Sequence, residues 1–346
     1  MIGESRARRA GNAGTPSQTD TKCRLLAGCA SRCRAGAVSA GAWASAAHGG
    51  ADTLAPAPMT PPLVTLASAP APWSALLSPA RLARDLWRHR ELIRQFTVRE
   101  LASRSKGTLL GVAWEVLKPL ATILVFTFVF SVVLRVRWQA AGIESETAGF
   151  VVMMLCAMIP FNVFSQAVLA APTLVLSRPN LVKKVVFPLE VLGVSATLAS
   201  LVTALIFAVL VLILLLLTTG RVPPTAALLP VTIVPVVMLT LGVTWFLASL
   251  GVFLRDIGQL LNVVVSNILF FSAPIFYPIE AVPEHLRFIP YLNPMTYPVL
   301  DARRVLVLGE APDWPVLAAF TVACAVVMQA GYAWFVKSRR GLADVI

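Results

Sequence analysis

The chain of 346 residues is too apolar for a soluble globular protein, because 57% of it is hydrophobic and 13% charged, whereas globular domains carry about 25% charged residues. Its net charge of +12 does not indicate nucleic-acid binding. The Lys and Arg residues flank long apolar runs, as membrane anchors do. Composition and charge therefore predict an integral membrane protein.

Residues 1–78 form an extension rich in Ala, Pro and Ser, and prolines recur from Pro56 to Pro79. Because proline interrupts helices, we expect this segment to be disordered; a misassigned start codon is the alternative. The sequence at 26–29 resembles a lipoprotein cleavage box. Such a box needs ~7–15 apolar residues before it, and Lys22 and Arg24 stand there instead, which argues against a lipoprotein.

Residues 79–108 are amphipathic. Four apolar residues recur at helical spacing on one face: Leu82, Leu86, Ile93 and Phe96. Basic residues occupy the opposite face: Arg81, Arg84 and Arg88. This pattern favours a helix lying in the membrane interface with its arginines toward lipid phosphates. A cytoplasmic helix packed on the bundle is the alternative.

Six later stretches are long enough to span a bilayer, which takes ~20 apolar residues: 109–134, 150–176, 189–217, 226–252, 259–279 and 314–336. Glu115 and Lys118 weaken the first prediction, and Pro274 and Pro278 interrupt the fifth. We therefore expect an all-α protein with a six-helix transmembrane domain over 109–337. A cytoplasmic tail, 338–346, follows it.

The basic residues predict the orientation. With a cytoplasmic N-terminus, sixteen Lys and Arg residues from Arg81 onward fall on the inner side. Six fall on the outer side: Arg135, Arg137, Arg221, Arg287, Arg303 and Arg304. This asymmetry places both termini in the cytoplasm, in a multi-pass protein of the inner membrane.

The segment 177–188 predicts a short amphipathic helix on the cytoplasmic face. Pro179 can open a helix and Pro188 can end one. Apolar side chains fill one arc, and Lys183 and Lys184 lie opposite. The helix could seal a loop against lipid or present the lysines to a partner protein.

The predicted spans lack ionisable carboxylates, amines and imidazoles over 121–134, 150–176, 191–219, 260–279 and 316–336. Ion-coupled carriers need such groups at mid-depth, so we do not expect ion-driven transport. No zinc-protease, hydrolase-elbow or phosphate-loop motif occurs, and we predict no catalytic residue and no metal ligand. A partner chain would then hydrolyse any ATP used. Asp301, Arg303 and Arg304 remain the best place for a hidden site, with a loop anchor as the favoured alternative.

Aromatic side chains recur in the spans and could pack on sugar rings along a conduit. The candidates are Trp114, Phe126, Phe130, Phe161, Phe164, Phe270, Phe271 and Tyr277. Contact with lipid or with neighbouring helices is the commoner role of such residues, so we assign only part of this set to a channel.

Several motifs, in order, resemble the permease subunits of ABC exporters for polysaccharides such as O-antigen, capsule and teichoic acid. The resemblance covers residues 79–346. Its motifs are the amphipathic entry 92–101, the stretch 104–114 followed by Lys118 and Pro119, the segment 180–190, the charged turn 253–257, the proline-rich 272–278 with 293–296, and the tail 339–346. The aromatic residue usual near Arg104 in that family is missing here.

The resemblance implies a homodimer with two separate ABC ATPase subunits, which bind the ATP and magnesium, and a glycan carried on polyprenyl pyrophosphate. It implies an ATPase-docking helix over 177–188 that includes Pro179, Asn180, Lys183, Lys184 and Phe187. Contacts to lipid head groups or pyrophosphate fall to Arg84, Arg88, Arg99, Arg104 and Lys106. Arg255 and Asp256 form a cytoplasmic turn, and the outer region 272–312 re-enters the membrane and gates the exit.

Other functions stay open at this point. A drug- or lipid-exporting ABC permease of the same fold is the nearest alternative. A membrane-embedded glycosyl- or phosphotransferase and a non-transporting scaffold are alternatives from other classes.

Overall fold

The computed structural model describes residues 78–104, 110–133, 143, 145–178, 187–254 and 256–345. Across these ranges the regular structure is helical, and no strand occurs in them. The extension 1–77 lies outside them, so its predicted disorder stays a prediction. The core of the predicted docking helix, 179–186, also lies outside the described residues, as do Lys106 and Arg255.

Among the described residues, four helices are long and apolar enough to cross a membrane. They are α6 (Glu146–Leu176), α8 (Glu190–Thr219), the helix Pro224–Phe253 that contains α9 (Leu229–Phe253), and the part Trp314–Arg339 of α14 (Trp314–Val345). They correspond to the second, third, fourth and sixth predicted spans. The all-helical membrane architecture is thereby confirmed, whereas the six-span count stays a prediction.

The first predicted span begins later than the apolar run suggests. Gly111 adopts a left-handed backbone (φ 51°) in a short 3₁₀ turn, η1 (Gly111–Ala113). The helix α5 (Trp114–Phe126) starts only after it and continues into the π-helical turn η2 (Thr127–Val133). The predicted start at residue 109 was therefore wrong, because hydropathy does not register backbone conformation.

The fifth predicted span is shorter than expected. It comprises α10 (Ile257–Val263), the π-helical turn η4 (Val264–Leu269) and α11 (Phe270–Ser272). Ala273 is extended (ψ 143°), as steric conflict with a following proline requires. Pro274 therefore ends the helix, and the predicted end at residue 279 was wrong.

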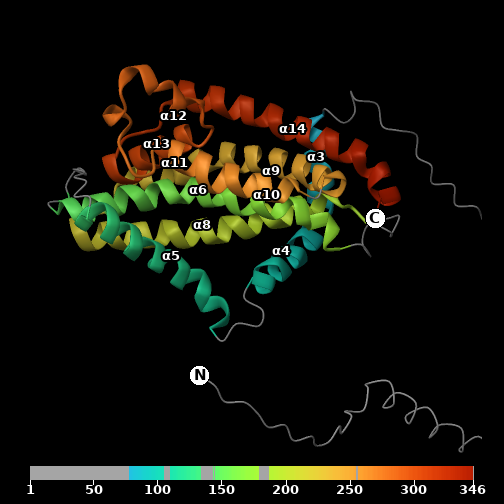
Figure 1. Ribbon diagram of the computed structural model, residues 1–346, viewed down its shortest axis with the longest axis horizontal. Helices are drawn as coiled ribbons and strands as arrows, with labels where there is room; N and C mark the ends of the chain where they lie inside the picture. The colour runs from blue at the N-terminus through green and yellow to red at the C-terminus, as the bar shows by residue number, and fades with distance from the viewer. Residues whose placement is uncertain are drawn as a thin grey trace, which may run out of the picture. The chain divides into compact units, whose positions relative to one another are not determined.

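Helix α6 lies at the centre of the fold and packs against α8, α9 and α13 (Figure 1). Most of its residues are buried, including Phe150, Met154 and Val163. A helix that is apolar on all sides is buried in a protein core or in a bilayer, and in α6 most residues are covered by protein. α8 and α9 lie against it, and α14 packs on α9. These three helices leave many of their own apolar residues exposed.

Glycines let the backbones of α9 and α14 touch. A Cβ atom on Gly331 would lie 2.1 Å from the carbonyl oxygen of Gly242. A Cβ atom on Gly251 of α9 would likewise lie 2.6 Å from the backbone of Pro172 in α6. Small residues of this kind allow the close packing on which helix association in membranes depends.

The N-terminal amphipathic segment forms two helices, α3 (Pro79–Arg88) and α4 (Arg90–Arg104), separated at His89. Its apolar face packs on the bundle. Leu82 and Ile93 are buried, and they belong to one cluster with Trp245 of α9 and Phe335 of α14. These contacts agree with the alternative of a helix packed on the bundle, whereas the location of the segment in the membrane interface stays a prediction.

The outer region consists of short helices. They are η5 (Ile279–Ala281), η6 (Glu284–Leu286), α12 (Phe288–Leu292), α13 (Thr296–Arg303) and η7 (Arg304–Leu308). Asn293 donates to the carbonyl oxygen of Leu269 (2.8 Å) and to the Ser272 hydroxyl (2.9 Å), which ties the region to the end of α11. Its predicted re-entry into the membrane stays a prediction.

The predicted tail 338–346 continues α14 as far as Val345. Arg339 pairs with Glu190 at 3.5 Å and also donates to the carbonyl oxygen of Phe187. The last helix is therefore fastened to the start of α8, directly after the predicted docking helix.

The contact between α9 and α14 can be tested by adding one methyl group. We expect Gly331→Ala to lower the free energy of unfolding by about 1–3 kcal/mol, because the added atom must displace backbone rather than a flexible side chain. Thermal unfolding in detergent measures the change. Gly258→Ala in α10, where a Cβ atom meets nothing within 4 Å, is the matched control and should not destabilise the protein. Equal effects of the two substitutions would contradict the close contact.

Candidate functional site

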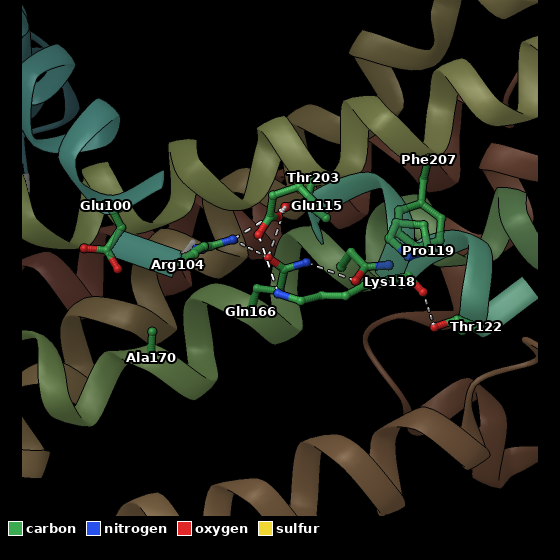
Figure 2. A pocket seen from close by; sticks show the side chains of 11 residues that line it. Glu100, Arg104, Glu115, Lys118, Pro119, Thr122, Gln166, Ala170, Thr203 and Phe207 are labelled. Atoms are coloured by element: carbon green, nitrogen blue, oxygen red, sulfur yellow. Dashed lines mark hydrogen bonds and ion pairs between the residues drawn. The ribbon is translucent and has the colours of Figure 1, made fainter. Parts of the chain in front are cut away.

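A cavity of about 570 Å³ lies between α4, α5, α6 and α8 (Figure 2). We call it the wedge cavity. Eleven residues line it: Glu100 and Arg104 of α4; Glu115, Lys118, Pro119 and Thr122 of α5; Asn162, Gln166 and Ala170 of α6; Thr203 and Phe207 of α8. Eight of these side chains are polar or charged, which is unusual among helices of this apolarity.

The course of α5 creates the cavity. Helix α4 ends at Arg104, and the chain reaches α5 at Trp114, so the two helices meet the bundle at an angle to each other (Figure 1). The far end of this helical stretch, η2, contacts α6. Much of α5 is exposed, with Leu124 at 71%. The polar side chains of its first turns face the space that remains between α5 and the bundle (Figure 2).

A hydrogen-bond network crosses the cavity and joins all four helices. The Arg104 Nη1 atom donates to Gln166 Oε1 (2.5 Å) and lies 3.5 Å from the Thr203 hydroxyl. That hydroxyl is 3.2 Å from Gln166 Oε1 and 3.3 Å from Glu115 Oε2. Gln166 donates in turn to Asn162 (3.1 Å). Polar groups in an apolar surrounding need such partners, since an unsatisfied group costs free energy.

A second group of contacts holds the two flanks of the predicted docking helix. Arg178 forms a 2.7 Å ion pair with Glu100 of α4 and stands over the Phe96 ring at 5.5 Å. On the other flank, Phe187 packs on the same Phe96 ring at a centroid distance of 5.5 Å. Arg178 and Phe187, which flank the segment 179–186 in the sequence, therefore both contact α4, the helix that carries Arg104 into the wedge cavity.

The predicted channel aromatics divide into two groups. Phe126, Phe130, Phe161, Phe270 and Phe271 form one cluster of rings. Its centre is Phe276, whose ring lies 4.8 Å from both Phe126 and Phe130. Most members are buried or half-buried, whereas Phe271 is exposed. The cluster thus joins α5 to α11, and Phe276 was absent from the sequence-based set.

The remaining aromatic candidates lie elsewhere. Phe164 belongs to the buried core around α6. The Tyr277 hydroxyl donates to the carbonyl oxygen of Ser272 at 2.8 Å and so closes the end of α11. Trp114 is half-buried at the start of α5.

The basic residues that were predicted to contact lipid head groups lie in two different places. Arg84, Arg88 and Arg99 are exposed on α3 and α4, whereas Arg104 enters the wedge cavity and is engaged by Gln166. Lys106, Lys183, Lys184, Pro179, Asn180 and Arg255 lie outside the described residues. Asp256 is exposed where α10 begins.

Arg303 is a loop anchor. It is buried and donates to the carbonyl oxygens of Met153 (3.2 Å) and Ile275 (2.9 Å), which fastens the outer region to α6. Burial lowers the pKa of its guanidinium to about 10, so the group stays charged at neutral pH. Burial raises the pKa of Asp301 to about 6, against the opposing effect of Arg304. The anchor interpretation of this cluster agrees with these contacts.

Sequence reasoning missed the uncharged members of the wedge cavity. It searched the spans for ionisable groups and passed over Asn162, Gln166 and Thr203. Their helical spacing was available, because Asn162 and Gln166 are one turn apart on α6. Glu115 was noted only as a weakness of the first span. An acid that opens an apolar helix signals a buried partner.

The comparisons with known proteins identify the family. The ABC-2 type transporter family matches residues 91–305, which is more than half of the chain. This chain belongs to the ABC-2 type transporter family. The resemblance found from the sequence motifs is thereby confirmed at the level of an ABC-2 permease.

Curated relatives of the permease carry a more specific name. It is 29% identical over 272 residues to the O-antigen export system permease protein RfbA of Myxococcus xanthus, with 77% of this chain and 99% of the relative covered. It is 24% identical over 221 residues to the protein of the same name from Klebsiella pneumoniae, with 63% and 81% covered.

Membership of the family defines the kind of protein. It is a multi-pass membrane subunit of a transporter, and an ABC ATPase partner handles the ATP. The expectations of a transport subunit and of an ATPase partner agree with this. Stoichiometry, orientation and substrate are finer questions that the family does not answer.

The network can be tested at Gln166. We expect Gln166→Leu to lower the free energy of unfolding by about 1–3 kcal/mol, because Arg104 loses an acceptor in an apolar surrounding. Thermal unfolding in detergent measures the change in stability. Gln95→Leu on α4 is the matched control, since the Gln95 amide is exposed and donates to the Glu91 carboxylate at 3.5 Å. A Gln166 variant as stable as the control would contradict the network.

Proposed function

We propose that the permease exports a lipid-linked polysaccharide, of the O-antigen, capsule or teichoic-acid type, across the cytoplasmic membrane. The observation that carries this is the match along 99% of an O-antigen export permease. A relative aligned from end to end supports a shared substrate class more than a partial match would. The absence of ionisable groups from most of the spans agrees with transport driven from outside the bilayer.

In this proposal the active transporter is a homodimer with two ABC ATPase subunits on the cytoplasmic side. ATP and magnesium bind to those subunits and not to the permease. Both termini face the cytoplasm. The segment 177–188 docks on the ATPase through Lys183 and Lys184, and its fixed flanks, Arg178 and Phe187, pass movement to α4 and α14. This assignment is supported by the contacts of Arg178 with Glu100 and of Phe187 with Phe96.

The substrate's route follows from the same residues. The exposed arginines, Arg84, Arg88 and Arg99, lie near anionic head groups or the pyrophosphate carrier. The aromatic cluster around Phe276 supplies flat apolar faces for sugar rings, with the exposed Phe271 as its most accessible member. The outer region, fastened by Arg303 and Asn293, forms the exit.

Deleting the gene tests the substrate class. We expect lipid-linked glycan to accumulate on the cytoplasmic side and the surface polysaccharide to disappear, because synthesis continues while export stops. Extraction of lipid-linked glycans and surface staining measure the two pools, and re-expression of the intact gene is the control. Normal surface polysaccharide with loss of drug or lipid export would favour a drug- or lipid-exporting permease instead.

Charge reversal tests the docking segment. We expect Lys183→Glu combined with Lys184→Glu to abolish co-purification of the ATPase or its stimulation by the permease, because acidic side chains would repel the acidic partner surface that two lysines imply. The matched control reverses two exposed arginines of α4, Arg90→Glu with Arg94→Glu. Unchanged assembly and export in the lysine variant would remove the docking role.

A further inference from the structure

The wedge cavity combines charges of both signs. Glu100 and Glu115 contribute two carboxylates, and Arg104 and Lys118 contribute two cations. The lining is therefore formally neutral. Its volume of about 570 Å³ falls within the ~300–1,000 Å³ of small-molecule sites. Ionisable side chains among the apolar helices of a membrane protein mark functional sites, which makes this cavity a candidate binding site.

The two charged side chains of α5, Glu115 and Lys118, form only a long ion pair with each other. Lys118 lies 3.7 Å from Glu115, beyond the ~2.7–2.9 Å of a direct charge-assisted hydrogen bond. The Lys118 side chain is 58% exposed, whereas that of Glu115 is 12% exposed. Lys118 at the exposed mouth and Glu115 inside, which also accepts from Thr203 at 3.3 Å, can therefore each bind a further polar group.

An apolar surface adjoins the cavity. Val116, Leu117 and Leu120 of α5 are 41–44% exposed, and they alternate along the helix with the cavity residues Glu115, Lys118 and Pro119. Phe207 of α8 lines the cavity itself. A molecule with a polar head and apolar chains matches this combination, because its head can enter the cavity while its chains lie along α5.

The sign of the charges decides which head group fits. Glu100 is already paired with Arg178, so a purely anionic head would face the carboxylate of Glu115, which is largely shielded from solvent. Like charges repel more strongly there than in water. A head with a phosphate and a primary ammonium complements both signs. The ammonium has three N–H donors for carboxylate oxygens, and the phosphate accepts from Lys118 and Arg104.

We propose that the wedge cavity binds the head group of a zwitterionic phospholipid of the phosphatidylethanolamine class. The ammonium lies against Glu115, the phosphate lies against Lys118 at the mouth, and the acyl chains cover the exposed apolar side chains of α5. The lipid is a resident of the resting permease and not the exported molecule. The proposal therefore goes beyond the proposed function and does not depend on the identity of the glycan.

Native mass spectrometry of the intact permease with added lipid tests the site. The probes are phosphatidylethanolamine and phosphatidylglycerol with identical acyl chains, so only the head group differs. We expect the first bound phosphatidylethanolamine to have an affinity about tenfold higher than phosphatidylglycerol, the scale of one or two charge-assisted hydrogen bonds. Equal affinity, or tighter binding of phosphatidylglycerol, would overturn the proposal. A second copy of the chain closing this face would also give equal affinities.

Two substitutions locate the site. Glu115→Gln keeps the size of the side chain and removes the carboxylate, so the preference for phosphatidylethanolamine should disappear. Glu284→Gln, at an acid that is 91% exposed in the outer region, is the matched control and should keep it. Lys118→Gln serves if Glu115→Gln does not fold, because its exposed side chain tolerates change, and it should weaken phosphatidylethanolamine binding. An unchanged preference in a folded Glu115→Gln variant, or unchanged phosphatidylethanolamine affinity in Lys118→Gln, would overturn the proposal.

Discussion

Polar groups within a membrane-embedded protein must find partners inside the protein, and this constraint shapes the permease where α4, α5, α6 and α8 meet. Arg104 enters the bundle from α4, and Glu115 enters from α5. Gln166 of α6 and Thr203 of α8 accept and relay their hydrogen bonds. Without these amide and hydroxyl groups, Arg104 would lose the acceptors described here, and Glu115 would keep its 3.7 Å contact with Lys118. The network therefore determines how α5 can lie against the bundle.

The same helix α4 connects this network to the two residues that flank the predicted docking segment. Glu100 lies one helical turn before Arg104 and pairs with Arg178, and Phe96 lies one turn earlier and packs on Phe187. Three successive turns of α4 thus contact, in order, both flanks of the predicted docking segment and the wedge cavity. An ATPase-driven permease needs a rigid element of this kind, because work done at the cytoplasmic surface has to reach the membrane-embedded helices.

The sequence was sufficient for the features that depend on local pattern. Long apolar runs predicted α6, α8, α9 and α14, and the family motifs identified an ABC-2 permease. Features set by backbone geometry were missed. The left-handed Gly111 delays α5, and Pro274 ends α11, although hydropathy is continuous through both. The orientation of an amphipathic helix was equally undetermined, since the face carrying Leu82 and Ile93 suits lipid and protein alike.

The candidate site was predictable only in part for a related reason. A charged residue at the start of an apolar span can be recognised from the sequence, as Glu115 and Lys118 can. An amide such as Gln166 carries no such signal, because its role depends on which helix lies opposite. The aromatic residues were recognised individually, but their gathering around Phe276 follows from the turn after Pro274, which the sequence did not reveal.

A double-mutant cycle on Arg104 and Gln166 tests the central claim most directly. Arg104→Met, Gln166→Leu and the double variant are compared by the free energy of unfolding of the purified permease in detergent. The account predicts a coupling energy of about 1–3 kcal/mol, as found for residues that share one hydrogen-bond network. Additive effects, within about 0.3–0.5 kcal/mol, would show that the two side chains act independently and that the network does not hold these helices together.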